Sequence, residues 1–252
     1  MKYLISFLFL ALAFSMKSEA KVTLPSILGD NMVLQQQAEV KLWGKARPNA
    51  TVTVKTSWNG QTYKSSSDGK GGWSLTVSTP VAGGPYKIIF NDGELLTLQN
   101  VLIGEVWFCS GQSNMEMPMG GFDRQPVRGT NDIIAKAKPS TPIRMYTTDS
   151  KDGRWVRQFS KTPVEDCQAN GWKYAVNVSH ISAVSYYFAR YIQEVLEVPV
   201  GIVVSTWGGS KIEAWMSRES IKPFSSIDLS ILDNDAEVKN PTTLRVYSTM
   251  AR

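Results

Sequence analysis

The sequence predicts a mixed fold, in which an all-β module comes first and an α/β domain with a parallel sheet follows. Short runs of β-forming residues separated by turn residues fill the segment 21–100. An apolar run at 101–108 then ends abruptly in small polar residues. Further along, a helical pattern of apolar residues leads into a second apolar run at 200–205. Strand, helix and strand in this order are typical of a parallel sheet with a right-handed crossover.

The first 20 residues have the pattern of a signal peptide. Lys2 is followed by an apolar core at 4–14, and Ser18-Glu19-Ala20 fits a small-x-small cleavage site. The core is too short to span a bilayer comfortably, although an N-terminal membrane anchor is the alternative. We therefore expect a mature protein that begins at Lys21, is exported to the periplasm or secreted, and has no membrane association after cleavage.

Residues 21–100 are predicted to form a β-sandwich domain. Runs of β-formers at 40–43, 51–54, 73–77 and 86–90 are separated by turn sequences such as Asn59-Gly60. Alternation of apolar and polar residues within these runs indicates strands that bury one face. The module contains no histidine, no cysteine and no carboxylate cluster. We therefore do not expect catalysis in it.

The segment 101–115 is the strongest candidate for a catalytic site. Its apolar, β-branched first half predicts a strand buried on both faces. Gly111 permits a tight turn after that strand, which would place the Ser113 hydroxyl at the carboxyl end of the sheet. Met115 stands where a G-x-S-x-G nucleophile elbow has its second glycine. Ser113 is thus a candidate nucleophile, and the alternative is a serine that only caps a helix.

Two blocks of sequence, 105–115 and 198–215, resemble SGNH-type carbohydrate esterases, and the sialate O-acetylesterase family in particular. The resemblance implies that 101–252 is the N-terminal, incomplete part of an SGNH-type α/β/α hydrolase domain. It also implies that Ser113 is the nucleophile of a serine carboxylic-ester hydrolase. The implied reaction removes O-acetyl groups from sialic acids or other carbohydrates, so the expected partner is an O-acetylated carbohydrate. No metal or organic cofactor is implied.

Donors for an oxyanion hole can be assigned in part. The backbone N–H of Ser113 is one candidate. Glycines that follow a strand allow backbone N–H groups to point into a site, as in the Trp207-Gly208-Gly209 turn. The resemblance implies that Gly209, or failing it Gly208, supplies the second donor. The alternative is that these two glycines only turn the chain.

The sequence does not indicate which residue would act as the general base for Ser113. The only histidine, His180, begins a helical pattern and has no carboxylate motif beside it, so we expect a surface residue. Relatives have an Asp-x-x-His block near their C-terminus and a Gln-Gly-Glu-Ser-Asn-type block, and neither occurs here. We therefore expect a truncated relative with very slow turnover at most. A catalytically inactive fragment or carbohydrate-binding pseudoenzyme, and an acetylxylan-type esterase, are the alternative functions.

The remaining elements of the second domain are predicted from periodicity. Apolar residues recur at helical spacing over 179–196, with Arg190 and Glu194 on the opposite side, Ser179 as N-cap and Pro199 after the end. The apolar residues of this helix are Ile181, Val184, Phe188, Tyr191, Ile192 and Val195. A short helix is expected at 132–138 and a short strand at 143–146.

Composition excludes several other classes of function. The net charge of +5 is spread thinly, without the basic patch that nucleic-acid binding requires. One histidine and two distant cysteines do not supply a zinc site. Cys109 and Cys167 would form one disulfide or remain free, and a free Cys109 at the end of a buried strand is the favoured interpretation. The sequence does not predict an oligomeric state.

Overall fold

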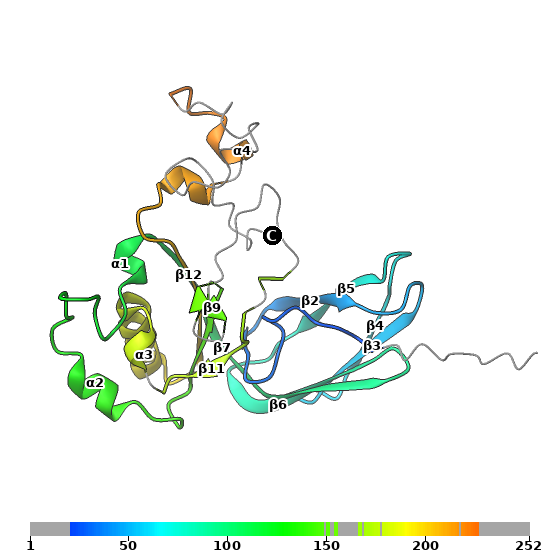
Figure 1. Ribbon diagram of the computed structural model, residues 1–252. Helices are drawn as coiled ribbons and strands as arrows, with labels where there is room; N and C mark the ends of the chain where they lie inside the picture. The colour runs from blue at the N-terminus through cyan, green and yellow to red at the C-terminus, as the bar shows by residue number, and fades with distance from the viewer. Residues whose placement is uncertain are drawn as a thin grey trace, which may run out of the picture.

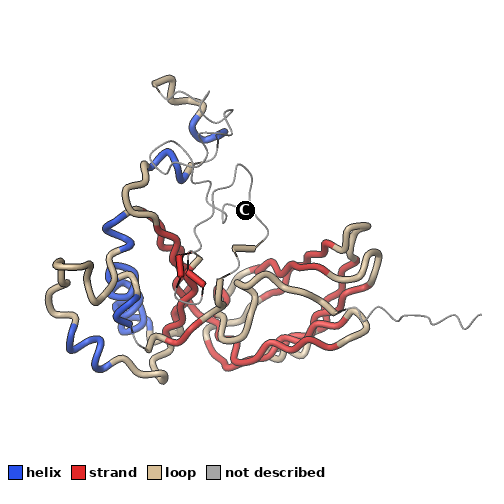
Figure 2. The backbone as a smooth tube through the Cα atoms, in the orientation of Figure 1, coloured by secondary structure: helices blue, strands red, loops and turns tan. Residues whose placement is uncertain are grey.

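The structure is a computed structural model that describes residues 21–148, 150–151, 154–155, 166–167, 169–176, 178–216 and 218–226. The predicted signal peptide, residues 1–20, lies outside the described residues. No helix within the described ranges is long and apolar enough to span a membrane. Strands make up the first part of the chain, and helices appear only after residue 111 (Figures 1 and 2).

The N-terminal part consists of strands that pair both with consecutive strands and with strands farther along the chain. The four predicted runs are confirmed as β2, β3, β5 and β6, whereas β4 was not predicted because its residues are mostly polar. Strand β3 pairs with β4 and β6, and β2 pairs with β5 in a separate two-stranded sheet. The strands are β1 (Val33–Gln35), β2 (Glu39–Lys45), β3 (Thr51–Thr56), β4 (Thr62–Ser66), β5 (Gly72–Ser78) and β6 (Gly83–Asn91).

One long strand, β7 (Leu95–Gly111), connects the two parts of the molecule. Its first half pairs antiparallel with β6, and its second half pairs parallel with β12 (Val200–Thr206). The strand therefore crosses residue 100, where the sequence suggested a domain boundary. Asn100 has a positive φ of 55° within the strand, and its side-chain amide donates to Asn31 and to the Tyr174 hydroxyl.

The second part is built on three parallel strands in the order β8–β12–β7, with β8 spanning Ile143–Thr147. The short β11 (Lys173–Tyr174) pairs antiparallel with β8 at the edge. These strands belong to one mixed eight-stranded sheet that continues into the N-terminal part through β7. The prediction of a mixed fold with a parallel sheet is thus confirmed.

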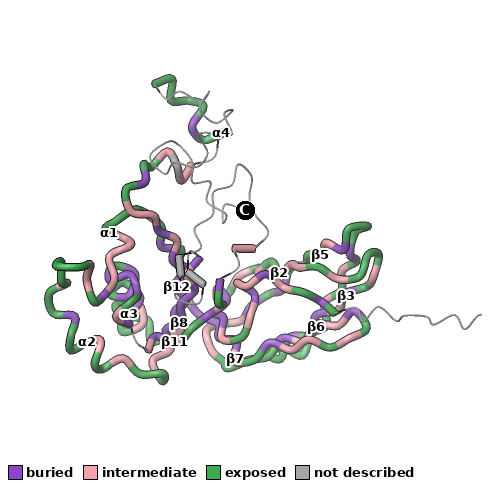
Figure 3. The backbone as a smooth tube through the Cα atoms, viewed as in Figure 1, coloured by how far each residue is buried: buried purple, intermediate pink, exposed green. Residues whose placement is uncertain are grey.

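Strands β8 and β12 are buried on both faces. The prediction that 101–108 is buried on both faces is wrong for Trp107 and Phe108 of β7, which are 42% and 47% exposed. Ile202 and Val204 of β12 belong to an apolar cluster on the side of helix α3 (Ala183–Leu196). Val203 belongs to the other cluster, which includes Tyr146, Trp172 and core residues of the N-terminal strands. Helix α3 therefore covers one face of the sheet, and the N-terminal part lies on the opposite side (Figures 1 and 3). Burial on two sides explains the near-continuous apolar sequence of β12.

Helix α3 exists as predicted, but it begins later and turns a different side to the sheet. Its N-cap is Ser182, not Ser179, and the Ser182 hydroxyl accepts from the Ser185 N–H at 3.2 Å. Residues 178–180 form a 3-10 turn instead. The buried side chains are Ala183, Ser185, Tyr186 and Ala189, while Val184, Phe188, Tyr191 and Val195 are 36–66% exposed. Both sides of the helix are rich in apolar residues, and the side with small residues allows closer approach to the sheet.

The remaining described elements are short. The predicted helix near 132–138 is confirmed as α2, and the predicted strand at 143–146 lies in β8. The other elements are α1 (Ser113–Glu116), α2 (Asn131–Lys136), β9 (Ser150–Lys151), β10 (Arg154–Trp155), η1 (Val178–His180), η2 (Ile212–Trp215) and α4 (Arg218–Ile221).

The two cysteines are free and belong to different apolar clusters. Cys109 is buried beneath α3, and burial raises the pKa of its thiol. Cys167 lies on the other side of the sheet, with its sulfur 2.8 Å from the Tyr146 hydroxyl. The expectation of a free Cys109 is confirmed.

Candidate active site

The turn that follows β7 presents Ser113 to solvent. Gly111 ends the strand with a φ of +155°, a conformation that residues with a side chain rarely adopt. Gln112 then caps α1, whose first residue is Ser113. The Ser113 side chain is exposed, and its hydroxyl donates to the Gln112 side-chain oxygen at 2.9 Å. The sequence expected this position for the serine, at the carboxyl end of a strand in a parallel sheet.

The segment after Ser113 is fixed against the start of α3. Backbone bonds run from the Met119 N–H to the Ile181 carbonyl at 2.7 Å and from the Ala183 N–H to the Met117 carbonyl at 2.8 Å. The Ser185 hydroxyl donates to the Met115 sulfur at 3.3 Å. These contacts hold the serine turn against the buried side of α3, so its position is set by the core and not by an isolated loop.

A second turn lies beside the serine turn because β12 and β7 are adjacent and parallel. Thr206 pairs with Gly111, and the Trp207 N–H donates to the Gly111 carbonyl at 3.0 Å. The next residues form a turn closed by the Ser210 N–H, which donates to the Trp207 carbonyl at 3.2 Å. Gly209 has a φ of +76° within this turn. The structure therefore brings together the two segments that the sequence singled out.

The two glycines of this turn differ in their surroundings. The Gly208 N–H donates to the Glu116 carboxylate. For the Gly209 N–H, the described part of the chain provides no acceptor, and a Cβ built on Gly209 would meet nothing within 4 Å. The Ser113 N–H, the other predicted donor, points to the Gln112 side-chain oxygen at a long 3.3 Å, a neutral acceptor that a ligand would have to displace. Of the three predicted oxyanion donors, Gly209 is therefore the one whose N–H has no acceptor among the described residues.

Sequence reasoning missed Glu116. It lies half-buried at the end of α1, three residues after Ser113, and contacts the second turn. The available signal was the carboxylate one helical turn beyond the serine, since residues three apart lie on the same side of a helix. Nothing in the sequence indicated that the 207–210 turn would be its neighbour.

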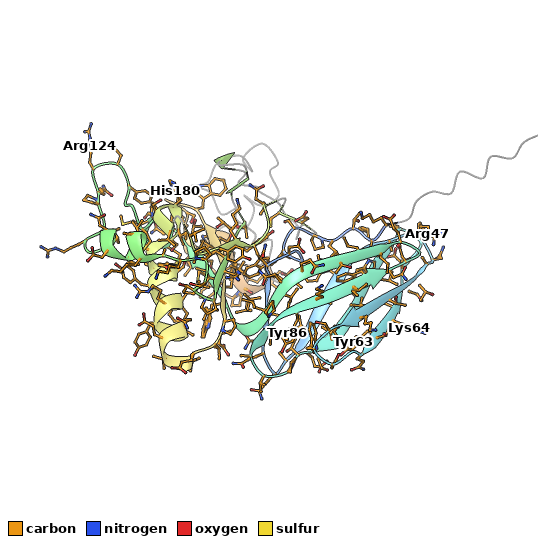
Figure 4. The ribbon with its side chains drawn as sticks, turned by 90° about the horizontal axis from the view of Figure 1, so that it is seen from below. Arg47, Tyr63, Lys64, Tyr86, Arg124 and His180 are labelled. Atoms are coloured by element: carbon orange, nitrogen blue, oxygen red, sulfur yellow. The ribbon has the colours of Figure 1, made fainter. Side chains whose placement is uncertain are left out.

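No hydrogen bond joins His180 to Ser113 among the described residues. The residue is exposed in η1, shortly before α3, and its ring makes no side-chain hydrogen bond or ion pair with another described residue. Figure 4 shows His180 on the helical part of the molecule, far from Arg47 and Lys64 of the N-terminal strands. Among the described residues, the Ser113 hydroxyl has only Gln112 as a side-chain hydrogen-bond partner. The sequence-based expectation of a surface histidine agrees with this placement.

Metal ligands do not gather near these turns. Over the ranges that the structure describes, no three His, Cys, Asp or Glu side chains lie close enough together to hold a metal ion.

Comparison with known proteins identifies the family. The family model described as "Carbohydrate esterase, sialic acid-specific acetylesterase" matches residues 103–230, which include both turns. The chain belongs to this carbohydrate esterase family. It is 30% identical to the sialate O-acetylesterase of Pongo abelii over 217 residues and 30% identical to that of Homo sapiens over 213 residues.

Each of these alignments covers 78% of the chain but 39% of the relative, so the chain spans about two fifths of the length of those curated relatives. A crystal structure of a carbohydrate acetylesterase from Xanthomonas citri is similar, with a TM-score of 0.71 and 31% identity. That similarity covers 85% of this chain and 46% of the other. It extends the likeness from sequence to the arrangement of the strands.

Proposed function

We propose that this chain provides the nucleophile and the oxyanion hole of an O-acetylesterase acting on sialic acids or other carbohydrates. The observation that supports the proposal is the placement of Ser113 and Gly209 on adjacent turns, at the carboxyl ends of β7 and β12. Family membership supports the substrate class, since the related proteins are named sialate O-acetylesterases and a carbohydrate acetylesterase.

The proposed chemistry is acyl transfer. The Ser113 Oγ attacks the acetyl carbonyl carbon and gives up its proton to a base, and the carbonyl oxygen becomes an oxyanion. The N–H groups of Ser113 and Gly209 donate to that oxyanion, which stabilises the charge as it develops. Collapse releases the sugar hydroxyl and leaves an acetyl group on Ser113. Water then hydrolyses the ester and releases acetate.

We assign the second oxyanion donor to Gly209 and not to Gly208. The Gly208 N–H already donates to a carboxylate, so it would have to leave an anionic acceptor in order to bind an oxyanion. The Gly209 N–H carries no such cost, and its positive φ is compatible only with a residue that lacks a side chain or tolerates strain.

A catalytically inactive, carbohydrate-binding role is the second candidate. It is favoured by one observation, which is that no described histidine or carboxylate contacts the Ser113 hydroxyl. An acetylxylan-type specificity is a variant of the first proposal and differs only in the sugar.

We extend the proposal to the domains and to export. Residues 101–252 would form part of an SGNH-type α/β/α hydrolase domain, with α3 on one face of the parallel sheet. The strands within 21–100 would form a β-sandwich, in which the β2–β5 sheet packs on the β3–β4–β6 sheet over shared apolar residues. Residues 1–20 would direct export and be removed before Lys21.

Acetate release decides between the esterase and the inactive form. The assay measures release from p-nitrophenyl acetate and from an O-acetylated sialic acid, with acetylated xylan as the competing sugar. In serine hydrolases, loss of the triad leaves a rate roughly 10³–10⁴ above that in water. We expect slow release of that order, unchanged in His180→Ala. Because the oxyanion hole and substrate binding support this residual rate without the serine, a further loss in Ser113→Ala would show that Ser113 itself reacts.

Ser110→Ala is the matched control, because Ser110 is also exposed near the end of β7. Equal rates for the wild-type chain and Ser113→Ala would show that Ser113 does not react in this chain and would favour the inactive form. Fast turnover abolished by His180→Ala would instead make His180 the base.

A further inference from the structure

Glu116 links the two turns of the candidate site. Its carboxylate accepts from the Gly208 N–H across 92 residues of sequence. A Cβ built on Gly208 would lie 3.0 Å from the Glu116 Oε2 atom and 3.9 Å from the Ser113 Cα atom. The carboxylate, the second turn and the backbone of the nucleophile therefore meet at one point, and a methyl group on residue 208 would require the carboxylate to shift.

The second turn is held together by its own contacts. The Ser210 hydroxyl donates to the Trp207 carbonyl at 2.7 Å, and the Trp215 indole N–H donates to the Ser210 hydroxyl at 2.9 Å. These bonds keep the turn closed but do not fix its position relative to Ser113. The Trp207 N–H bond to Gly111 fixes one end of the turn. The Glu116 carboxylate fixes the next peptide.

Glu116 itself is anchored on the nucleophile side. Its own N–H donates to the Gln112 carbonyl at 2.9 Å, and the following Met117 N–H donates to the Ser113 carbonyl at 2.9 Å. The carboxylate therefore moves with the α1 turn that contains Ser113. Any displacement of α1 relative to β12 has to stretch the bond to Gly208.

We propose that Glu116 is a positioning residue that sets the distance between the Ser113 hydroxyl and the Gly209 N–H. The inference rests on the proposed function, because it gives the 207–210 turn the role of an oxyanion donor. A charge-assisted hydrogen bond from Gly208 orients the peptide that precedes Gly209. The same bond occupies the carboxylate, so that its negative charge is directed at a donor and not at the reacting carbonyl.

Three variants separate this role from simple stability. Glu116→Gln keeps a hydrogen-bond acceptor and removes the charge, whereas Glu116→Ala removes the acceptor. Gly208→Ala places a methyl group against the same carboxylate and should reproduce the effect of Glu116→Ala. Glu194→Ala is the matched control, because Glu194 is a surface carboxylate on α3 that pairs only with Arg190 in the described residues.

The first readout is the amide NMR spectrum of the ¹⁵N-labelled chain. In the wild-type chain, the Gly208 amide should be protected from hydrogen exchange by its bond to the Glu116 carboxylate. Glu116→Gln should keep the protection. Glu116→Ala should abolish it and shift the Gly209 amide. A Gly208 amide that is unchanged in Glu116→Ala would overturn the proposal.

The second readout is covalent labelling of Ser113 by a fluorophosphonate, followed by intact mass. The Ser113 Oγ forms the P–O bond, fluoride leaves, and the hydroxyl proton passes to the buffer. Because misplacement of a reacting group by about 1 Å can lower a rate by about 10²-fold, we expect labelling of Glu116→Ala to slow by about 10- to 100-fold. Glu116→Gln and Glu194→Ala should label at rates close to that of the wild-type chain.

The outcomes distinguish the positioning role of Glu116 from the proposed function of Ser113 as the nucleophile. Equal labelling rates for the wild-type chain and Glu116→Ala would overturn the positioning role and leave the nucleophile intact. A wild-type chain whose label is not lost in Ser113→Ala would overturn the proposed function, and the positioning role with it, whatever the NMR spectra show.

Discussion

Gly104 lies where β7 passes the start of β12, and the contact there is too close for any side chain. A Cβ built on Gly104 would lie 2.0 Å from the Pro199 carbonyl oxygen and 2.7 Å from its carbon. The same carbonyl accepts from the Glu105 N–H at 2.9 Å, which begins the pairing of the two strands. Gly104→Ala therefore has to push the strands apart at their first hydrogen bond.

The expected cost follows from two terms. Overpacking of a dense interior typically costs about 1–3 kcal/mol, and weakening the Glu105 N–H bond adds about 1 kcal/mol. The lower entropy of an unfolded chain with alanine offsets less than about 1 kcal/mol of this. We expect Gly104→Ala to lower the free energy of unfolding by about 2–4 kcal/mol, a large fraction of the roughly 5–15 kcal/mol of a typical domain.

Urea denaturation followed by tryptophan fluorescence measures this change. With a slope near 3 kcal/mol per M, the midpoint should fall by about 1 M. Gly69→Ala is the matched control, because a Cβ on Gly69 would meet nothing within 4 Å and its φ is not positive. That variant should change stability by less than about 0.5 kcal/mol. Similar midpoints for the two variants would refute the reasoning.

Two further predictions concern α3 and the buried hydroxyl of Tyr146. Ser182→Ala removes the N-cap of α3 and should lower the free energy of unfolding by about 1 kcal/mol, measured by thermal or urea unfolding. Ser179→Ala should change it by almost nothing. The reverse order of the two effects would reinstate Ser179 as the cap. Burial, together with the bond to Cys167, raises the pKa of Tyr146, so the folded state holds the phenolic proton more tightly than the unfolded chain does. This stability is present below the unfolded pKa of about 10 and is lost as the pH rises above it. Tyr146→Phe should cost about 1–2 kcal/mol at neutral pH and flatten the alkaline loss of stability, and an unchanged alkaline slope would count against this assignment.

The sequence by itself determined the kind and order of the elements. Strong β-former runs bounded by turn residues located β2, β3, β5 and β6, because alternation and turn chemistry are local properties. The abrupt change from apolar to small residues before Ser113 located the end of β7 and the turn after it. Strand β4 was missed because its residues are mostly polar and give no such contrast.

Tertiary packing decided which face of α3 is buried and where the helix begins. Periodicity identified the helix, but both of its sides contain apolar residues. Only the presence of the sheet could select the side with Ala183 and Ala189, since close approach favours small side chains. The cap moved to Ser182 because the preceding residues bond to the segment 117–120 instead.

In the candidate site, too, the sequence indicated the residues but not their proximity. Ser113, Gly208 and Gly209 were each visible as residues at the ends of apolar runs. Their proximity depends on the pairing of β7 with β12, and so does the contact between Glu116 and Gly208. A strand register between residues about 90 positions apart leaves no local trace in the sequence. The sequence therefore determined which groups are available for chemistry, and the parallel pairing decided which of them meet.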